Sequence, residues 1–138
     1  MTPQSSLTIF VGRAGMALLF IISGFGKFTA AAATKAYFAK TGVPSPDIAY
    51  VVAVAVELGV GTLFLLGVKT RWMAAVLALF TVATAMLGHG NVADMAQKTQ
   101  FLKNLAIAGG FLAFSVLGGG AYSLDGQFAR PGRIKARA

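Results

Sequence analysis

Four stretches of about 20 mostly apolar residues constrain this 138-residue chain more than any other feature. A helix needs about 20 such residues to cross a hydrocarbon core roughly 30 Å thick. Two of the stretches, at 72–93 and 104–124, contain no Asp, Glu, Lys or Arg, and the other two are interrupted only by Arg13, Lys27 and Glu57. The sequence therefore predicts four transmembrane helices, at about residues 7–28, 48–67, 72–89 and 102–120.

The composition supports a membrane protein and excludes several other classes. Hydrophobic residues make up 57% of the chain and charged residues 12%, whereas soluble domains carry about 25% charged residues. The absence of cysteine excludes disulfides and thiolate metal sites, and one histidine cannot form a bis-histidine haem or three-ligand zinc site. The net charge of +8 is spread between apolar blocks, so it indicates membrane orientation. We expect the lipid bilayer as partner and no nucleic acid.

Basic residues predict the orientation of the spans. An even number of spans places both termini on one side, together with six basic residues in the hairpin after residue 67 and in the tail. Lysines on the opposite side are offset by Asp47 and Asp94. By the positive-inside rule both termini are cytoplasmic. The predicted fold is all-α: an integral membrane antiparallel four-helix bundle over residues 1–128, followed by a basic cytoplasmic tail over 129–138.

Prolines and glycines predict where the spans begin and end. Pro44 and Pro46 favour a turn into the second span, with Asp47 as its N-cap. Gly67 is placed to end that span, and the glycines at 118–120 to end the fourth. We also expect a short interfacial helix within residues 29–40 on the outer side.

Small residues predict the faces on which the helices pack, because lipid supplies no hydrophobic drive between them. Each span has one inward stripe: Arg13, Ala17, Phe20, Gly24 and Lys27 in the first, Ala49, Ala53, Glu57 and Gly61 in the second, Ala74, Ala78, Thr81 and Ala85 in the third, and Ala106, Gly110 and Ala113 in the fourth.

Glu57 is the most informative polar residue. It lies about nine residues into its span, roughly 14 Å deep at about 1.5 Å per residue. A charge at the helix centre costs about 2.5–3.5 kcal/mol on insertion scales, so the carboxylate must be protonated, paired or hydrated. Two interpretations stay open: an acid that binds a neighbouring helix for structural reasons, and a ligand-binding or proton-handling group.

Arg13 is the candidate partner of Glu57. It lies roughly 9 Å inside the cytoplasmic face, so it either extends to the interface or forms a buried ion pair with Glu57. Without that pair, Glu57 would face the outer side, toward Lys27, His89 and Lys103.

The remaining polar candidates lie near the outer ends of the spans. Lys27 and Lys103 are interpreted as interfacial anchors or as ligand contacts. His89 is either an ordinary interfacial histidine or a hydrogen-bonding, proton-exchanging group beside Lys103 and Asn104. The chain contains no phosphate-binding loop or nucleophile motif of a known enzyme class. The residues alone thus predict a polar pocket without naming its chemistry.

Short motifs follow one another over about residues 10–126. They are Arg13 with the helix ending 23–27 (SGFGK), the turn 42–44 (GVP), the acid Glu57, the segment 65–67 (LLG) before a basic hairpin, the pair 88–89 (GH), the segment 103–110 (KNLAIAGG), and the segment 118–125 (GGGAYSLD). In this order they resemble the DoxX family of small bacterial inner-membrane proteins.

The resemblance implies four transmembrane helices in a multi-pass protein of the bacterial inner membrane. The family is similar to the small subunit of thiosulfate:quinone oxidoreductase, and some members are linked to membrane-associated oxidative-stress complexes. The resemblance thus implies a bound quinone and a partner redox protein.

Three functions remain as hypotheses. The first is a non-catalytic accessory or scaffold subunit of a redox or stress-related complex, which needs only packing faces and a basic tail. The second is a redox subunit that binds a quinone or another lipophilic ligand through Glu57, Arg13, His89, Lys103, Asn104 and Lys27. In that case electrons come from a partner or a bound cofactor, because the chain has no redox-active metal or thiol ligands of its own. The third is a small proton-coupled transporter, which would require a homo-oligomer because four helices leave little room for alternating access.

Overall fold

The computed structural model describes residues 3–129, and every regular element in this range is a helix. Four helical spans are long and apolar enough to cross a membrane, which confirms the prediction of a four-span all-α protein. They are α1 (Pro3–Thr29), the composite of α3 (Pro46–Val54), η1 (Ala55–Val60) and α4 (Gly61–Leu66), then α5 (Thr70–Gly88) and α6 (Met95–Leu117). Two short helices, α2 (Ala31–Lys40) and α7 (Leu124–Phe128), complete the described chain.

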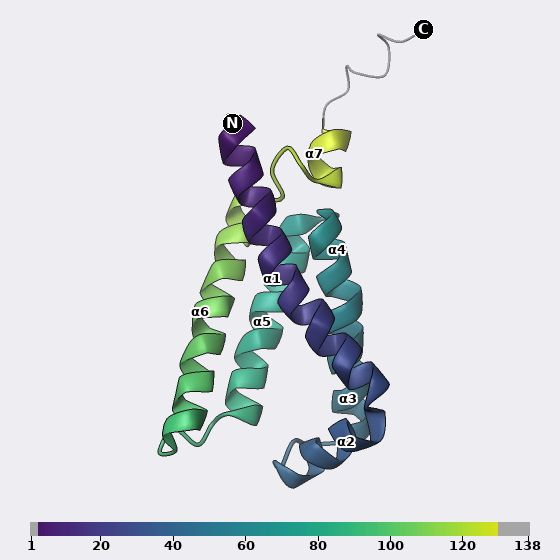
Figure 1. Cartoon of the computed structure of the whole chain (residues 1–138), viewed down its shortest axis with the longest axis vertical. Coiled ribbons are helices and arrows are strands. Elements are labelled where there is room, and N and C mark those ends of the chain that lie inside the picture. Colours follow the sequence, from purple (N-terminus) through teal and green to yellow (C-terminus); the bar gives the residue numbers. More distant parts are fainter. Residues whose placement is uncertain (1–2, 130–138) are drawn as a thin grey trace, which may run out of the picture.

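The spans run alternately in opposite directions (Figure 1). The start of α1 and the short helix α7 lie at one end of the bundle, and α2 lies at the other end. These are called the terminal end and the α2 end below. The basic tail residues 130–138 lie outside the described residues.

We expect the terminal end to face the cytoplasm. The exposed Lys69 and Arg71 lie in or beside the α4–α5 hairpin at this end, and basic residues are retained on the cytoplasmic side. A green fluorescent protein fused after Ala138 should fluoresce, and alkaline phosphatase fused there should be inactive. The opposite pair of results would place the α2 end in the cytoplasm.

The helix ends follow from the turn residues, with one correction. Gly67 and Gly118 end their helices at φ of 74° and 77°, a left-handed backbone that favours glycine. The expectation that Asp47 caps the second span is wrong. Ser45 occupies the N-cap position without a side-chain cap, and Asp47 instead binds Lys35 of α2, with 2.8 Å between Oδ1 and Nζ. Proline is favoured at the first helical position because its fixed φ suits a helix start, so the helix already begins at Pro46 and Asp47 lies within its first turn.

The fourth span is longer than its apolar part. Helix α6 begins at Met95, with Asp94 as its N-cap accepting a hydrogen bond of 2.9 Å from the Gln97 backbone N–H. Its first two turns include the polar run 97–100 (QKTQ), so apolar counting alone placed the start near residue 102.

Three phenylalanines form the centre of the bundle. Phe111 of α6 packs edge-on against Phe20 of α1 and Phe64 of α4, with ring centroids 5.2 Å apart in both pairs. The predicted inward stripes of the first and third spans are confirmed, because their residues are buried apart from the partly exposed Lys27. The stripe predicted for α6 is wrong at Ala106 and Ala113, which are exposed, whereas Gly110 is half-buried against Met16 of α1. The buried residues of this helix are Ala108 and Phe111.

Gly24 allows α1 to approach the second span closely. A Cβ built on Gly24 would lie 2.7 Å from the Glu57 Cβ and 3.1 Å from the Leu58 backbone nitrogen. These distances leave no room for a side chain. The glycine therefore determines how near α1 passes to Glu57.

Replacing Gly24 with alanine should lower the free energy of unfolding by about 1–3 kcal/mol, because overpacking forces the two helices apart. Gly26→Ala is the matched control on the same helix, since no atom lies within 4 Å of its added Cβ. Unfolding by sodium dodecyl sulfate, followed by circular dichroism, measures both. Equal stability of the two variants would contradict the close approach.

The middle of the second span is a π-helical turn, η1, which contains Glu57. In a π-helix the hydrogen bonds join residues five apart, and such turns occur mostly as single insertions in α-helices, often at functional sites. The wide turn keeps Ala53, Glu57 and Gly61 together on the buried face, although a spacing of four residues drifts around a regular α-helix.

Candidate functional site

Glu57 forms an ion pair with Lys27. The Lys27 Nζ lies 2.9 Å and 3.0 Å from the two carboxylate oxygens and donates a further hydrogen bond of 2.7 Å to the Ser23 hydroxyl. Lys27 and Ser23 are one helical turn apart on α1, so both reach the same point on η1. The Glu57 side chain is 7% exposed and the Lys27 side chain 24% exposed. The two charges thus satisfy each other at the edge of a cavity.

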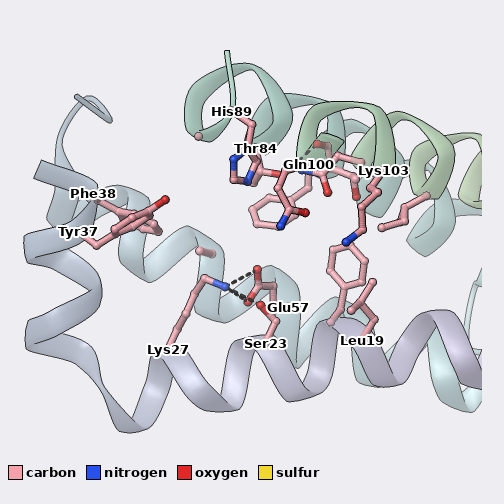
Figure 2. Close-up of a pocket in the computed structure, with 17 residues that line it drawn as sticks. Leu19, Ser23, Lys27, Tyr37, Phe38, Glu57, Thr84, His89, Gln100 and Lys103 are labelled. Atoms are coloured by element: carbon pink, nitrogen blue, oxygen red, sulfur yellow. Dashed lines mark hydrogen bonds and ion pairs between the residues drawn. The ribbon is translucent and has the colours of Figure 1, made fainter. Parts of the chain in front are cut away.

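The cavity at the α2 end has a volume of about 380 Å³. It lies between α1, η1, α5 and α6, and α2 contributes two aromatic side chains, Tyr37 and Phe38. Figure 2 shows the Lys27–Glu57 pair on one wall and His89, Gln100 and Lys103 on the opposite wall. The volume falls in the range of about 300–1,000 Å³ that is typical of small-molecule sites.

The wall formed by α5 and α6 carries polar groups. His89 Nδ1 donates a hydrogen bond of 2.7 Å to the Gln97 side-chain oxygen, and His89 also lines the cavity. Within residues 3–129, the side chains of Gln100, Lys103 and Asn104 have no hydrogen-bond or ion-pair partner, although all three line the cavity. The cavity therefore contains hydrogen-bond donors that are free to bind a ligand.

Apolar and aromatic side chains complete the cavity. Phe20 and Phe80 form part of the floor, with ring centroids 6.4 Å apart. Leu19 and Ile107 also line it. Such a mixture suits a molecule that has both a polar and an apolar part.

The predicted pairing of Arg13 with Glu57 is wrong. Arg13 is 1% exposed and lies at the terminal end, where its guanidinium donates to three backbone carbonyls. The distances are 3.2 Å to Leu65 O and 2.6 Å to Tyr122 O, and the third acceptor is Gly119 O. Arg13 therefore connects the end of α4 to the segment after α6, and it does not line the cavity.

Asp125 adds to this cluster at the terminal end. Its carboxylate accepts hydrogen bonds of 2.7 Å from the backbone N–H groups of Lys69 and Thr70, and one of 2.8 Å from the Thr70 hydroxyl. Burial alone would raise the pKa of Asp125, but these hydrogen bonds and the nearby Arg13 charge lower it below its ordinary value. The cluster ties the start of α5 to α7.

The structure thus brings together five of the six site candidates: Lys27, Glu57, His89, Lys103 and Asn104 all line the cavity. It adds Ser23, Gln100, Tyr37 and Phe38, which the sequence reasoning missed. Helical spacing could have indicated two of them, because Ser23 precedes Lys27 by four residues and Gln100 precedes Lys103 by three. Tyr37 and Phe38 carried no such signal, since their position depends on how α2 folds back.

The described part of the chain offers no set of metal ligands. Among residues 3–129, no three His, Cys, Asp or Glu side chains lie close enough to hold a metal ion. The cavity can supply hydrogen bonds, one ion pair, one further positive charge and apolar contact.

Comparisons with known proteins agree with a location in the membrane. A family model described as DoxX matches residues 8–90. The chain is 42% identical over 117 residues to the inner membrane protein YqjF of Escherichia coli K12, covering 85% of this chain and 88% of that protein. It is 37% identical over 123 residues to the inner membrane protein YphA of the same organism, covering 85% and 87%. No solved structure matches significantly.

Proposed function

This chain belongs to the DoxX family and is a multi-pass inner-membrane protein, and we propose that it binds a lipophilic molecule of the quinone class in the cavity at the α2 end. One observation carries the proposal. A cavity of about 380 Å³ within a membrane bundle combines aromatic walls with three polar side chains that have no partner among residues 3–129.

The charges of the cavity favour an electron-rich oxygen. Lys27 and Glu57 neutralise each other, so the ammonium group of Lys103 is the uncompensated charge among the lining residues that the structure describes. A quinone carbonyl accepts hydrogen bonds from such a group, and Asn104 and Gln100 supply further donors. Phe20, Phe80 and the α2 aromatics suit the flat ring.

The chain contributes binding and proton-handling groups to this function. Glu57 is the acid on the cavity wall, and His89 is a second group whose side-chain type can exchange a proton. The chain carries no cysteine and, over residues 3–129, no set of metal ligands. Electrons for quinone chemistry would come from a partner redox protein.

Thermal unfolding of the purified protein in detergent tests the proposal. The probe is a tetramethyl benzoquinone, fully substituted so that lysine side chains do not add to the ring. A bound ligand at about 100 times its Kd stabilises a protein by about 2.7 kcal/mol, so the wild-type unfolding temperature should rise. An unchanged unfolding temperature across the soluble concentration range would refute the proposal.

Lys103→Met should weaken quinone binding about tenfold or more, because a hydrogen bond to a charged group contributes about 1.5–3 kcal/mol. Lys98→Met is the matched control, since Lys98 is an exposed lysine of the same helix that does not line the cavity. Fluorescence quenching measures the affinities. Because Trp72 lies at the end of α5 away from the cavity, the assay uses a background in which Trp72→Phe removes this tryptophan and Phe38→Trp places one in the cavity. Equal affinities in the two lysine variants would remove Lys103 from the site.

An accessory role in a redox or stress-related complex is the second candidate, favoured by the outer face of α6. Only 11% of the apolar stretch of α6 is buried within the bundle, against 22–28% in the other spans. Exposed Ala106, Gly109 and Ala113 on this helix would allow a partner helix to approach closely. Cross-linking in native membranes from cysteines placed at these positions would detect a redox protein or a second copy. Cross-links no more frequent than those from an exposed cysteine on α1 would exclude this face.

A further inference from the structure

A second cavity, of about 280 Å³, lies between α2, α3 and α5. Its lining is almost entirely apolar and includes Val43, Ile48, Val52, Ala83 and Leu87. An engineered apolar cavity of about 150 Å³ holds one benzene molecule. The second cavity thus has room for a considerably longer hydrocarbon group.

The two cavities adjoin. Tyr37, Phe38, Ala53, Phe80, Thr84 and Gly88 line both of them. Figure 2 shows Tyr37 and Phe38 at the side of the polar cavity away from Lys103. A molecule that is bound by the polar groups can therefore continue past the two aromatic rings into the apolar cavity.

The second cavity also reaches the surface that faces lipid. Ile48, Val52 and Leu87 are 67%, 48% and 52% exposed, and they lie on α3 and α5, which are parts of two membrane spans. An apolar chain in this cavity can extend into the bilayer without crossing a polar surface.

We propose that the second cavity binds the alkyl or isoprenoid tail of the same molecule whose head group occupies the polar cavity, and that the molecule enters from the bilayer between α3 and α5. This inference rests on the proposed quinone-class function. Three observations support it: the shared lining of the cavities, the charged and amide side chains that line only the first of them, and the exposed apolar opening on the two spans. A ligand with both parts would match both cavities, whereas a short polar solute would use only the first.

Photolabelling in lipid nanodiscs tests this placement directly. The probe is a fully substituted benzoquinone with a decyl chain that ends in a diazirine. After irradiation, labelled peptides should map to residues 41–52 and 83–88. An excess of the same quinone without the diazirine should remove the label. Labelling elsewhere on the protein, or labelling that persists under competition, would overturn the inference.

Two substitutions fill the second cavity without touching the first. Ala49 and Ala83 line only the second cavity, so Ala49→Phe and Ala83→Phe should lower the labelling about tenfold, equivalent to about 1.4 kcal/mol. Ala106→Phe is the control, because Ala106 is exposed on α6 and lines neither cavity. The two substitutions lie on different helices, so the test remains valid if one of the two variants fails to fold.

The short tetramethyl benzoquinone separates this inference from the proposed function. Its thermal shift should be the same in wild type, Ala49→Phe and Ala83→Phe. If it binds the wild type but the tail labels other residues, the tail site is wrong and the head-group site stands. If the tetramethyl benzoquinone fails to bind the wild type, the proposed function is wrong. The photolabelling then shows whether the second cavity still binds an alkyl chain, as of a phospholipid.

Discussion

Replacing Arg13 with methionine should lower the free energy of unfolding by about 3 kcal/mol or more. The substitution leaves three carbonyl oxygens, of Leu65, Gly119 and Tyr122, without their donor, and each unsatisfied buried group costs about 1–3 kcal/mol. Unfolding in mixed micelles of mild detergent and sodium dodecyl sulfate, followed by circular dichroism, measures the loss.

Two further variants identify the cause. Arg71→Met removes an arginine near the same end that is exposed and should change the stability little. Arg13→Lys keeps the charge but replaces the planar fork by a single nitrogen, so it should recover only part of the loss. If Arg13→Met is as stable as Arg71→Met, the carbonyl contacts contribute nothing to folding.

The second large effect concerns the Lys27–Glu57 pair. Either Lys27→Met or Glu57→Gln alone leaves one charge in a membrane bundle without its partner, which is strongly destabilising for buried pairs. The double variant should lose less than the sum of the single losses, with a coupling energy of about 1–3 kcal/mol. The same detergent unfolding assay measures all four proteins of the cycle.

Arg13→Met combined with Glu57→Gln gives the control cycle. The two residues belong to separate clusters at opposite ends, so their losses should add within about 0.5 kcal/mol. A coupling between Arg13 and Glu57 as large as that between Lys27 and Glu57 would contradict the arrangement described above.

Hydropathy predicted the four spans because the length of an apolar stretch is a direct physical requirement of the bilayer. It placed the start of α6 too late for the same reason, since the polar turns after Asp94 are helical without being apolar. Small residues predicted the inner faces of α1 and α5. They failed on α6, where Ala108 and Phe111 face inward in place of Ala106 and Ala113, and Phe111 packs against Phe20 and Phe64.

The partner of Glu57 was harder to predict than its depth. The sequence indicated that a buried acid needs a neutralising group, and five of the six candidate residues do line one cavity. The choice of Lys27 depends on Gly24, whose missing side chain lets α1 approach η1. Arg13 donates instead to backbone carbonyls of the segment that follows α6 and folds back at the terminal end. The position of this segment cannot be predicted when each span is considered separately.

The π-helical turn η1 has a consequence for how the second span tolerates changes in length. The hydrogen-bonded turn of a π-helix contains one residue more than that of an α-helix. A π turn therefore takes up a one-residue insertion locally, and the helical segments on either side keep their orientation. The half of the span before the turn, α3, can thus keep the same face toward α2. The half after it, α4, keeps the same face toward Phe111 and Arg13. Deleting one residue of η1 would restore a regular α-helix with both halves still in phase, and only the carboxylate of Glu57 would lose its direction toward Lys27.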